Sequence, residues 1–545
     1  MRFALSLSAF LLVTTPALAL AQTAQPQINE TTLKTLTERL SSDEFEGRAP
    51  GTVGEEKTVA LLAQAFEKAG LKPGNNGSWF QDVPLVEITA SDVQPLVFTG
   101  GKTPLSFDYR TDMVVGSYRL DPTINLTNSE VVFVGYGVNA PERGWNDYAG
   151  VDVKGRTVVI LVNDPDWQAE GLEGTFGGKA MTYYGRWTYK YEEAARQGAA
   201  AAIIVHQSEP ASYGWNVVQS SWTGPQWQME GAEQGASQAI GWLQLEATRK
   251  LFASAGQDFD ALSAAAARPG FKAVPLGLKA STSFNSNVRR QASKNVIAIL
   301  PGTERPDEVV MHTAHWDHLG RCDAVDGDDI CNGAIDNATG TAAMVALAEA
   351  HAKAGPAKRT LAFMAVTAEE SGLLGAKYYA ANPVFPLNKT VGGVNVDSLP
   401  MAGATRNYGI VGPGKSELEG MLRPIIAAQD RVLEPAGNPA AGGYYRSDHF
   451  AFAQKGVPML YGGAGSNLVE GGVEAHKAYA AARAKIYHAP GDEYDPDWDW
   501  GGAMQDLRAY YTLSRQLAEG DMWPNWTPGD EFRAVRDASR AEISR

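Results

Sequence analysis

Acidic and imidazole side chains follow several apolar stretches in the second half of the chain. These candidate ligands are His315, Asp317, Asp336, Glu369, Glu370 and Asp397. Carboxylates that are brought close together repel one another and raise each other's pKa. A divalent cation removes that repulsion. Because histidine and carboxylate ligands without thiolates suit zinc with open coordination positions, the pattern indicates a catalytic zinc site.

The elements around these residues alternate between strands and helices. Apolar stretches typical of buried strands and periodic stretches typical of helices follow one another after residue 290. The expected strands are 295–302, 307–315, 359–368, 391–399 and 457–463, and the expected helices are 340–354 and 375–383. This alternation predicts an α/β fold with a doubly covered, mostly parallel sheet. Ligands bind beyond the carboxyl ends of such strands, which is where the candidate ligands stand.

Each candidate also has an ordinary structural explanation. A lone aspartate such as Asp336 commonly caps a helix, and an adjacent pair of glutamates commonly lies in a solvated loop. His312 and His318 flank His315 and are expected to be its polar neighbours rather than ligands. The metal hypothesis therefore depends on the whole set of positions.

An ordered set of motifs resembles a known family. The segments HTAHWDHLG, GAIDNATG, AEESGLLGA, VNVDSL, YRSDHFAF and YHAPGDEYD resemble the M28 family of zinc peptidases, which are di-zinc aminopeptidases and their relatives. The N-terminal DEFEGRAPGTVGE resembles their opening segment. The middle of the chain resembles the protease-associated (PA) domain that some members carry as an insertion. The resemblance implies a zinc aminopeptidase-like α/β fold with a smaller, β-rich PA-like domain inserted into it.

The resemblance also implies two zinc ions per chain and a ligand for each family position. Asp336 matches the carboxylate that bridges the two metals. His315 and Asp397 match the other ligands of one zinc, and Glu370 and His488 match those of the second. All family ligand positions are filled, which argues against a non-catalytic relative.

Further roles follow from the same resemblance. Glu369 matches the general base that takes a proton from a metal-activated water and passes it to the leaving amine. Asp317 matches an outer acid that orients the His315 imidazole. A substrate pocket is expected around YRSDHFAF, at Ser447, Asp448 and His449.

The domain organisation starts with a candidate signal peptide. Residues 1–21 combine Arg2, an apolar run and Ala-Leu-Ala at a cleavage position, so export to the periplasm or the medium is expected. The peptidase domain then occupies 22–90 and 286–545, with the PA-like insert at 91–285. No later stretch offers about 18 uncharged apolar residues, so no membrane-spanning segment is expected after cleavage.

Composition restricts the partners. The 545 residues carry a formal net charge of −15, which disfavours nucleic acid and anionic lipid, so peptides are the expected substrates. The two cysteines are too few for a disulfide scaffold. In an exported protein Cys322 and Cys331 are candidates for one disulfide that closes a short loop, and two free thiols are the alternative. The oligomeric state and the preferred N-terminal residue are not indicated.

Four functions remain open at this stage. The leading one is an exported zinc aminopeptidase that hydrolyses N-terminal residues from peptides. A glutaminyl-cyclase-like acyltransferase would hold one zinc. A metallo-carboxypeptidase would need a cation for the terminal carboxylate of its substrate, and Arg446 is a candidate. A binding protein with a PA domain would have lost ligands, and this chain has not.

Overall fold

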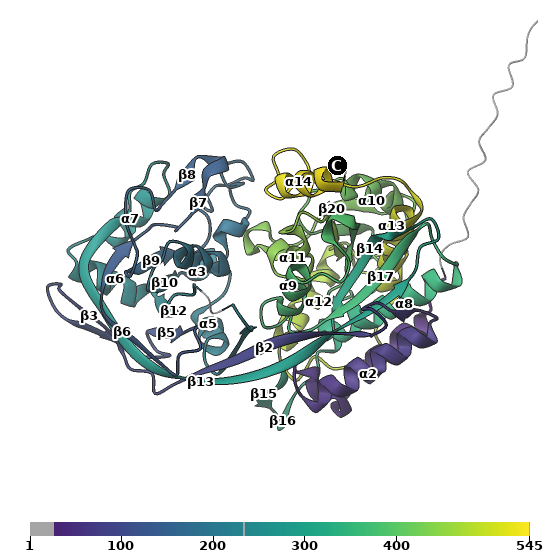
Figure 1. Ribbon diagram of the computed structural model, residues 1–545, viewed down its shortest axis with the longest axis horizontal. Helices are drawn as coiled ribbons and strands as arrows, with labels where there is room; N and C mark the ends of the chain where they lie inside the picture. The colour runs from purple at the N-terminus through teal and green to yellow at the C-terminus, as the bar shows by residue number, and fades with distance from the viewer. Residues whose placement is uncertain (1–26, 233–234, 544–545) are drawn as a thin grey trace, which may run out of the picture.

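The computed structural model describes residues 27–232 and 235–543. It forms two lobes joined by a pair of long strands, β2 (Phe80–Ser91) and β13 (Val274–Leu300) (Figure 1). The expected signal peptide lies outside the described residues. Within the described ranges, no helix has both the length and the apolar character needed to span a membrane.

The two long strands form an antiparallel ribbon. Their pairing runs from Ser91 opposite Asn285 to Phe80 opposite Val296. β2 therefore carries the chain away from the main lobe (27–90 and 286–543), and β13 brings it back alongside. Residues 91–285, which include the first part of β13, form the second lobe and are called the insert below.

The main lobe is built on a mixed sheet with the strand order β13-β17-β14-β18-β21-β19-β20. Its four central strands run parallel to one another, and β13 and β19 run antiparallel to their neighbours β17 and β21. The strands are β14 (Arg305–His315), β17 (Arg359–Val366), β18 (Thr390–Asn395), β19 (Asn407–Ile410), β20 (Val432–Pro435) and β21 (Met459–Ala464), with the short β1 (Lys72–Pro73) beside β13. This arrangement confirms the predicted α/β class with a mostly parallel sheet.

Helices cover both faces of this sheet. Successive residues of a strand point to opposite faces, so Val310 joins the core on one face while Met311 joins the core on the other. The first face is covered by α1 (Glu30–Leu40), α2 (Val53–Lys68), α8 (Gly340–Lys353), α10 (Leu418–Ala427) and α13 (Gly501–Glu519). The second face is covered by α9 (Leu374–Ala381) and α11 (His449–Ala453). Two further helices are α12 (Gly472–Ile486) and α14 (Arg533–Ile543).

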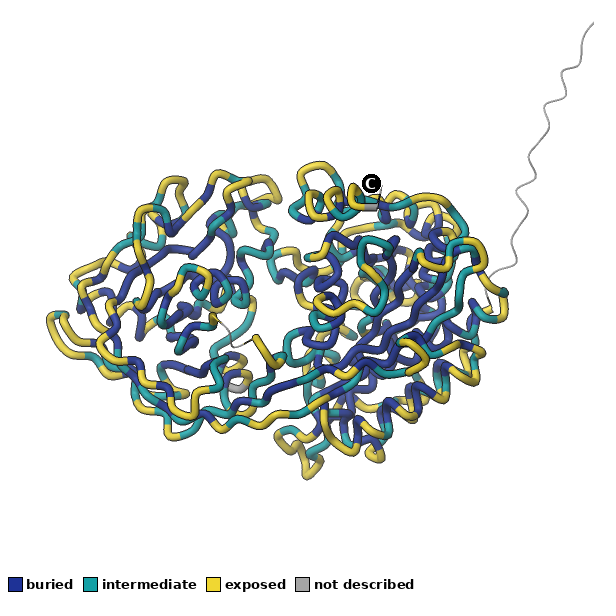
Figure 2. Tube along the Cα trace, viewed as in Figure 1, coloured by how far each residue is buried: buried dark blue, intermediate teal, exposed yellow. Residues whose placement is uncertain are grey.

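The insert has its own core of strands and helices. Figure 2 shows buried segments at the centre of each lobe and exposed residues around them. The strands of the insert are β3 (Leu96–Thr99), β4 (Leu105–Phe107), β5 (Met113–Gly116), β6 (Thr123–Phe133), β7 (Asn139–Ala140), β8 (Trp145–Asn146), β9 (Thr157–Leu161), β10 (Ala201–His206), β11 (Pro225–Met229) and β12 (Ala239–Gln244). Its helices are α3 (Trp187–Arg196), α4 (Ser208–Ala211), α5 (Trp215–Ser221), α6 (Leu245–Ser254) and α7 (Phe259–Ala266).

A small hairpin projects below the main lobe in Figure 1. It consists of β15 (Gly320–Val325) and β16 (Asp328–Cys331), which lie between the end of β14 and the turn that holds Asp336. A disulfide joins Cys322 to Cys331 across this hairpin. Both cysteines thus belong to a loop and are unavailable as metal ligands.

Candidate metal centre

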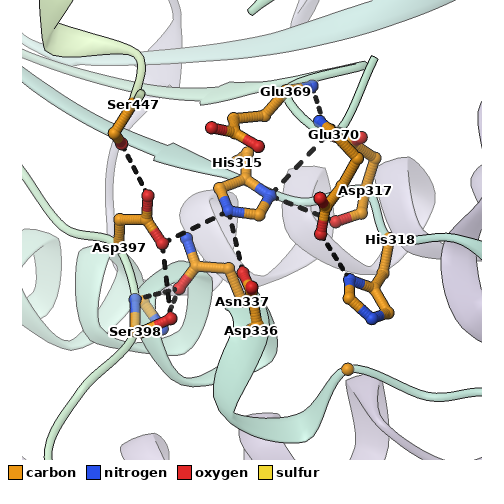
Figure 3. A network of polar contacts seen from close by, with 12 residues as sticks. His315, Asp317, His318, Asp336, Asn337, Glu369, Glu370, Asp397, Ser398 and Ser447 are labelled. Atoms are coloured by element: carbon orange, nitrogen blue, oxygen red, sulfur yellow. Dashed lines mark hydrogen bonds and ion pairs between the residues drawn. The ribbon is translucent and has the colours of Figure 1, made fainter. Parts of the chain in front are cut away.

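The candidate ligands lie beyond the carboxyl ends of three neighbouring parallel strands. His315 is the last residue of β14 and pairs in register with Val366, the last residue of β17. Glu369 and Glu370 follow β17, and Asp397 follows β18. Figure 3 shows these side chains turned toward one another. The sheet therefore brings together residues that are far apart in the sequence.

His315, Asp336 and Asp397 form the first cluster. The Nε2 of His315 lies 3.3 Å from a carboxylate oxygen of Asp336 and 3.5 Å from one of Asp397. Ligand atoms of the three residues lie within 4.8 Å of one another, so they could hold one metal ion. The family resemblance implied the same three residues as ligands of one zinc.

A second cluster shares Asp336 with the first. His488, which follows α12, places its Nε2 at 2.9 Å from Glu370 and at 3.5 Å from the second carboxylate oxygen of Asp336. The two oxygens of Asp336 therefore face two different histidines. A carboxylate in this position is suited to bridge two cations.

His318 also lies in the second cluster, although it was expected to be only a polar neighbour of His315. Its Nδ1 lies 2.6 Å from the Glu370 carboxylate, and its buried Nε2 has no hydrogen-bond partner in the described part of the chain. His318, Asp336 and Glu370 also have ligand atoms within 4.8 Å of one another. His318 is thus a candidate ligand or a group that orients Glu370. The sequence offered one indication of this role, because His318 lies three residues after His315 at the same strand end.

His312 has a different environment. It is fully buried in β14, where it stacks on Phe363 at 4.3 Å and its Nδ1 lies 3.1 Å from the carbonyl oxygen of Ala362. Burial lowers its pKa to about 4. His312 is therefore a neutral residue of the core.

The turn that presents Asp336 is held by residues that the sequence did not reveal. The buried Asp492 carboxylate accepts hydrogen bonds from the backbone N–H groups of Ile335 and Asp336, both at 3.1 Å. Arg483 of α12 pairs with Asp492 at 3.1 Å. Because Asp492 lies only four residues after His488, one loop supplies a candidate ligand and also fixes the backbone of another.

Asn337 links the same turn to the loop after β18. Its side-chain oxygen accepts hydrogen bonds from the N–H groups of Gly340 and Ser398, both at 3.0 Å, and its amide donates to the carbonyl of Val396 at 3.1 Å. The peptide bond between Asp336 and Asn337 is cis. Through these three hydrogen bonds, Asn337 fixes the turn that holds Asp336 relative to the strand end that carries Asp397.

A buried arginine from the N-terminal segment lies beneath the site. Arg48 has no exposed surface, and its guanidinium donates to the carbonyl oxygens of Leu40, Trp316, Asn332 and Gly333 at 2.6 to 2.9 Å. These carbonyls belong to α1 and to both ends of the segment between His315 and Asp336. Arg48 of the N-terminal segment DEFEGRAPGTVGE therefore has a structural role that the family resemblance did not indicate.

Asp317 lies close to His315 but contacts it mainly through the backbone. The Nδ1 of His315 is 3.2 Å from the Asp317 carbonyl oxygen and 3.8 Å from its carboxylate. The carboxylate instead accepts hydrogen bonds from the N–H groups of Glu369 at 3.1 Å and Glu370 at 3.4 Å. Asp317 thus positions the glutamate pair as well as the imidazole.

The electrostatics of the cluster favour a cation. Burial and then the neighbouring carboxylates Glu370 and Asp397 raise the pKa of Glu369 well above its usual range. Burial raises the pKa of Asp317 to about 7. Although burial opposes it, Glu370 and Asp336 raise the pKa of His488 to about 10. Like charges therefore crowd the site, and a divalent ion would relieve their repulsion. Together with the histidine and carboxylate donors, this crowding fits zinc.

The three expected pocket residues have different surroundings. Ser447 donates to a carboxylate oxygen of Asp397 at 2.6 Å, and neither buried oxygen of Asp448 has a hydrogen-bond partner among the described residues. His449 is fully buried between Tyr444 and Tyr461, with ring centroids 4.6 Å away in each case. Ser447 contacts the metal centre, and Asp448 is within electrostatic reach of His315 and Asp397, whereas His449 packs among aromatic rings.

Comparisons with known proteins agree with this geometry. Residues 295–512 match the model of peptidase family M28. A probable zinc metalloprotease of Leptosphaeria maculans is 41% identical over 86 residues, which is 16% of this chain and 20% of the relative. The protein named aminopeptidase NAALADL1 of Mus musculus is 27% identical over 146 residues, which is 25% of this chain and 18% of the relative. The chain therefore spans about a fifth of the length of these relatives.

Solved structures show a similar fold over a larger part of the chain. An aminopeptidase from Aneurinibacillus sp. strain AM-1 matches with a TM-score of 0.50 and 19% sequence identity, and the match covers 91% of this chain and 95% of that one. At this identity the likeness concerns the fold. It extends over both lobes described above.

Proposed function

The chain belongs to peptidase family M28 through residues 295–512, and from this premise we propose that it is an exported zinc-dependent aminopeptidase. Its substrates are peptides, from which it hydrolyses N-terminal residues. The observation that carries the proposal is the pair of ligand clusters that share Asp336. One shared carboxylate between two histidines suits a centre with two zinc ions.

The ligand sets follow from the distances. On these distances and on the family resemblance together, His315, Asp336 and Asp397 would hold one zinc, and Asp336, Glu370 and His488 would hold the other. Zinc bound at such a site supplies a Lewis acid for the scissile carbonyl and lowers the pKa of water. The protein positions these ligands through Arg48, Asn337 and Asp492, which bind the backbone around them.

Glu369 is the proposed general base. It lies beside His315 and Glu370, with ligand atoms of all three within 4.8 Å of one another, yet it is absent from the two ligand sets above. Its carboxylate accepts a proton from the attacking water and delivers it to the leaving amine. Asp317 keeps it in place through the hydrogen bond from the Glu369 N–H.

The remaining parts of the proposal concern location and the insert. The order of charge, apolar run and small residues in 1–21 supports a signal peptide, and hence a periplasmic or secreted enzyme. The insert 91–285 is proposed to be a PA-like domain, on the basis of its β-rich fold and its place between two halves of the peptidase domain.

A substrate panel tests the function. Aminoacyl p-nitroanilides and short peptides are offered to the protein that starts at residue 22, before and after chelation and again after zinc is added back. We expect activity that disappears with the chelator and returns with zinc. Peptides with an acetylated N-terminus should resist hydrolysis, and their rapid cleavage would contradict the aminopeptidase assignment.

The variant Glu369→Gln tests the mechanism. Because Gln cannot accept the proton, turnover should fall by about a hundredfold or more, while the zinc content stays at that of the wild type. Metal analysis and kcat are measured on the same preparation. Near-normal turnover would reject Glu369 as the base. A content of one tightly held zinc per chain, with no gain in rate from a second, would favour the glutaminyl-cyclase-like alternative.

A further inference from the structure

Three basic side chains gather where the insert meets the main lobe. Arg186 belongs to the insert and immediately precedes α3, Lys377 belongs to α9, and Arg446 lies just before α11. In Figure 1, α3 faces α9 and α11 across the middle of the molecule. We call Arg186, Lys377 and Arg446 the basic cluster.

Aromatic contacts fix this part of the insert against the main lobe. The ring of Tyr183 packs on Phe450 with centroids 5.1 Å apart and on Tyr445 at 6.3 Å. The N–H of Met181 also donates to the carbonyl of Pro439 at 3.1 Å. Since these contacts lie within a few residues of Arg186 on one side and flank Arg446 on the other, they hold the two arginines near each other.

The three side chains affect one another electrostatically. Burial and then Arg446 lower the pKa of Arg186 to about 10. Burial also lowers the pKa of Lys377, and Arg186 lowers it further, while Glu192 acts in the opposite direction. Arg186 is thus within electrostatic reach of both other cations.

In the described part of the chain, no ion pair neutralises this cluster. Among the described residues, none of the three side chains has a carboxylate within 4.0 Å, and the buried Nε of Arg186 has no hydrogen-bond partner. Glu192, the nearby acid, is already bound by the Tyr183 hydroxyl and lies 3.8 Å from Arg196. Arg186 and Lys377 are half-buried, whereas Arg446 is exposed. A partly buried cation without a partner is destabilising, so the arrangement suits an incoming anion.

The basic cluster adjoins the candidate metal centre through the backbone. Arg446 directly precedes Ser447, which donates to Asp397. The N–H of Lys377 donates to the carbonyl of Leu373, whose own N–H donates to the carbonyl of Glu369, each at 2.9 Å. The cluster is therefore only a few residues of chain away from Glu369 and from Asp397, and an extended peptide advances by about 3.3 to 3.6 Å per residue.

We propose that Arg186, Lys377 and Arg446 form a subsite that binds a carboxylate of a short peptide substrate. This inference rests on the proposed peptidase function and names its substrate class. Guanidinium groups bind carboxylates through two parallel hydrogen bonds, which gives the subsite its selectivity over neutral groups. The insert thereby supplies a specificity residue, Arg186, to a site whose other residues belong to the main lobe.

Two sources of the carboxylate are distinguished by two pairs of substrates. The first pair is Ala-Gly-Gly and its C-terminal amide, which differ only in the terminal carboxylate. The second pair is the amides of Ala-Glu-Gly and Ala-Gln-Gly, which differ only in the acidic side chain. In one of the pairs we expect the acid to have a KM lower by about ten- to hundredfold, as is typical for hydrogen bonds to charged groups. Equal kcat/KM within both pairs would overturn the proposal.

Variants connect the preference to the residues. Arg186→Gln and Lys377→Gln should each raise the KM of the preferred acid toward that of its neutral partner, and Arg186→Lys should retain part of the difference. The control is Arg249→Gln, because Arg249 is an exposed arginine of the insert that pairs with Glu246 and Asp260. An unchanged acid-to-neutral ratio in both Gln variants would also overturn the proposal.

The subsite can be tested even if no substrate is cleaved. Absence of turnover of alanyl p-nitroanilide with zinc present would count against the proposed peptidase function. Calorimetric titration of the chelated, inactive protein with the same four peptides then measures binding alone. Tighter binding of one acid than of its neutral partner, lost in Arg186→Gln, supports the subsite, and equal binding of all four refutes it.

Discussion

Arg48→Met should destabilise the main lobe strongly. The guanidinium is fully buried and donates four hydrogen bonds to the carbonyls of Leu40, Trp316, Asn332 and Gly333. Hydrogen bonds from a charged donor contribute about 1.5 to 3 kcal/mol each. Their simple sum of roughly 6 to 12 kcal/mol is an upper limit, because water and small shifts can satisfy some of the carbonyls after the change.

The expected loss in unfolding free energy is therefore about 3 to 5 kcal/mol, because the change leaves buried carbonyl oxygens unpaired at about 1 to 3 kcal/mol each before the surroundings relax. Methionine keeps an unbranched side chain of similar length, so the change removes the donors with little loss of volume. Urea denaturation followed by tryptophan fluorescence measures the free energy of unfolding for wild type and variant.

Arg39→Met is the matched control. Arg39 is an exposed arginine in the last turn of α1, close to Arg48 in sequence. Exposed substitutions of this kind usually change stability by no more than about 0.5 kcal/mol. A loss below about 1 kcal/mol for Arg48→Met would refute the view that this arginine holds the metal-binding segment together.

Two further predictions concern the site and the core. Asp492→Asn should weaken zinc binding by about 10- to 100-fold. The reason is that the single oxygen of an asparagine amide cannot replace the two carboxylate oxygens that accept hydrogen bonds from the N–H groups of Ile335 and Asp336. Competition with a chromogenic chelator measures the zinc affinity, and an unchanged affinity would contradict this role. His312 has a folded-state pKa of about 4, so the unfolded state binds more protons below pH 6.5 and stability falls as the pH drops from 6.5 to 4. For this one group the fall approaches about 1.4 kcal/mol per pH unit between the two pKa values and is about 1 kcal/mol from pH 6.5 to 5.5. Urea denaturation at these two pH values should therefore show a shallower pH dependence for His312→Leu than for wild type, and equal dependence would contradict the prediction.

Much of the site could be predicted because several candidate ligands directly follow strands that are recognisable from their apolar residues. A strand such as β14 is recognised from its apolar residues, and His315 is recognisable as the polar residue that ends it. Parallel neighbours then bring their carboxyl ends to one edge of the sheet, so Glu370 and Asp397 could be placed near His315 without further information. The assignment of His488 depended on the family resemblance alone, because it follows a helix and no strand leads to it.

Residues that act through the backbone were not predictable in the same way. Arg48, Asn337 and Asp492 bind peptide N–H and carbonyl groups. Every residue other than proline offers the same N–H and carbonyl, so the sequence contains no signal for which groups are paired. A charged residue in a Gly- and Pro-rich loop is normally solvated, and only the fold shows that Arg48 and Asp492 are buried.

The joining ribbon was missed for a related reason. β13 was expected only as the strand 295–302, but it begins at Val274. Its central part, 287–292, is exposed or only partly buried because it bridges the two lobes with solvent around it. A strand without a buried face does not show the alternation of apolar and polar residues on which strand prediction depends.

The ribbon also explains how an insertion can serve the site that it interrupts. Ser91 and Asn285 are paired in adjacent strands, so the chain leaves and re-enters the main lobe at neighbouring positions. The N-terminal segment can therefore supply Arg48 beneath residues that lie more than 260 positions later, as the contact with Asn332 shows. The same geometry fixes the insert on one side of the main lobe, where Tyr183 packs on Phe450. An inserted domain held at two such points could contribute the proposed subsite residue Arg186 without altering the strands that carry the candidate metal ligands.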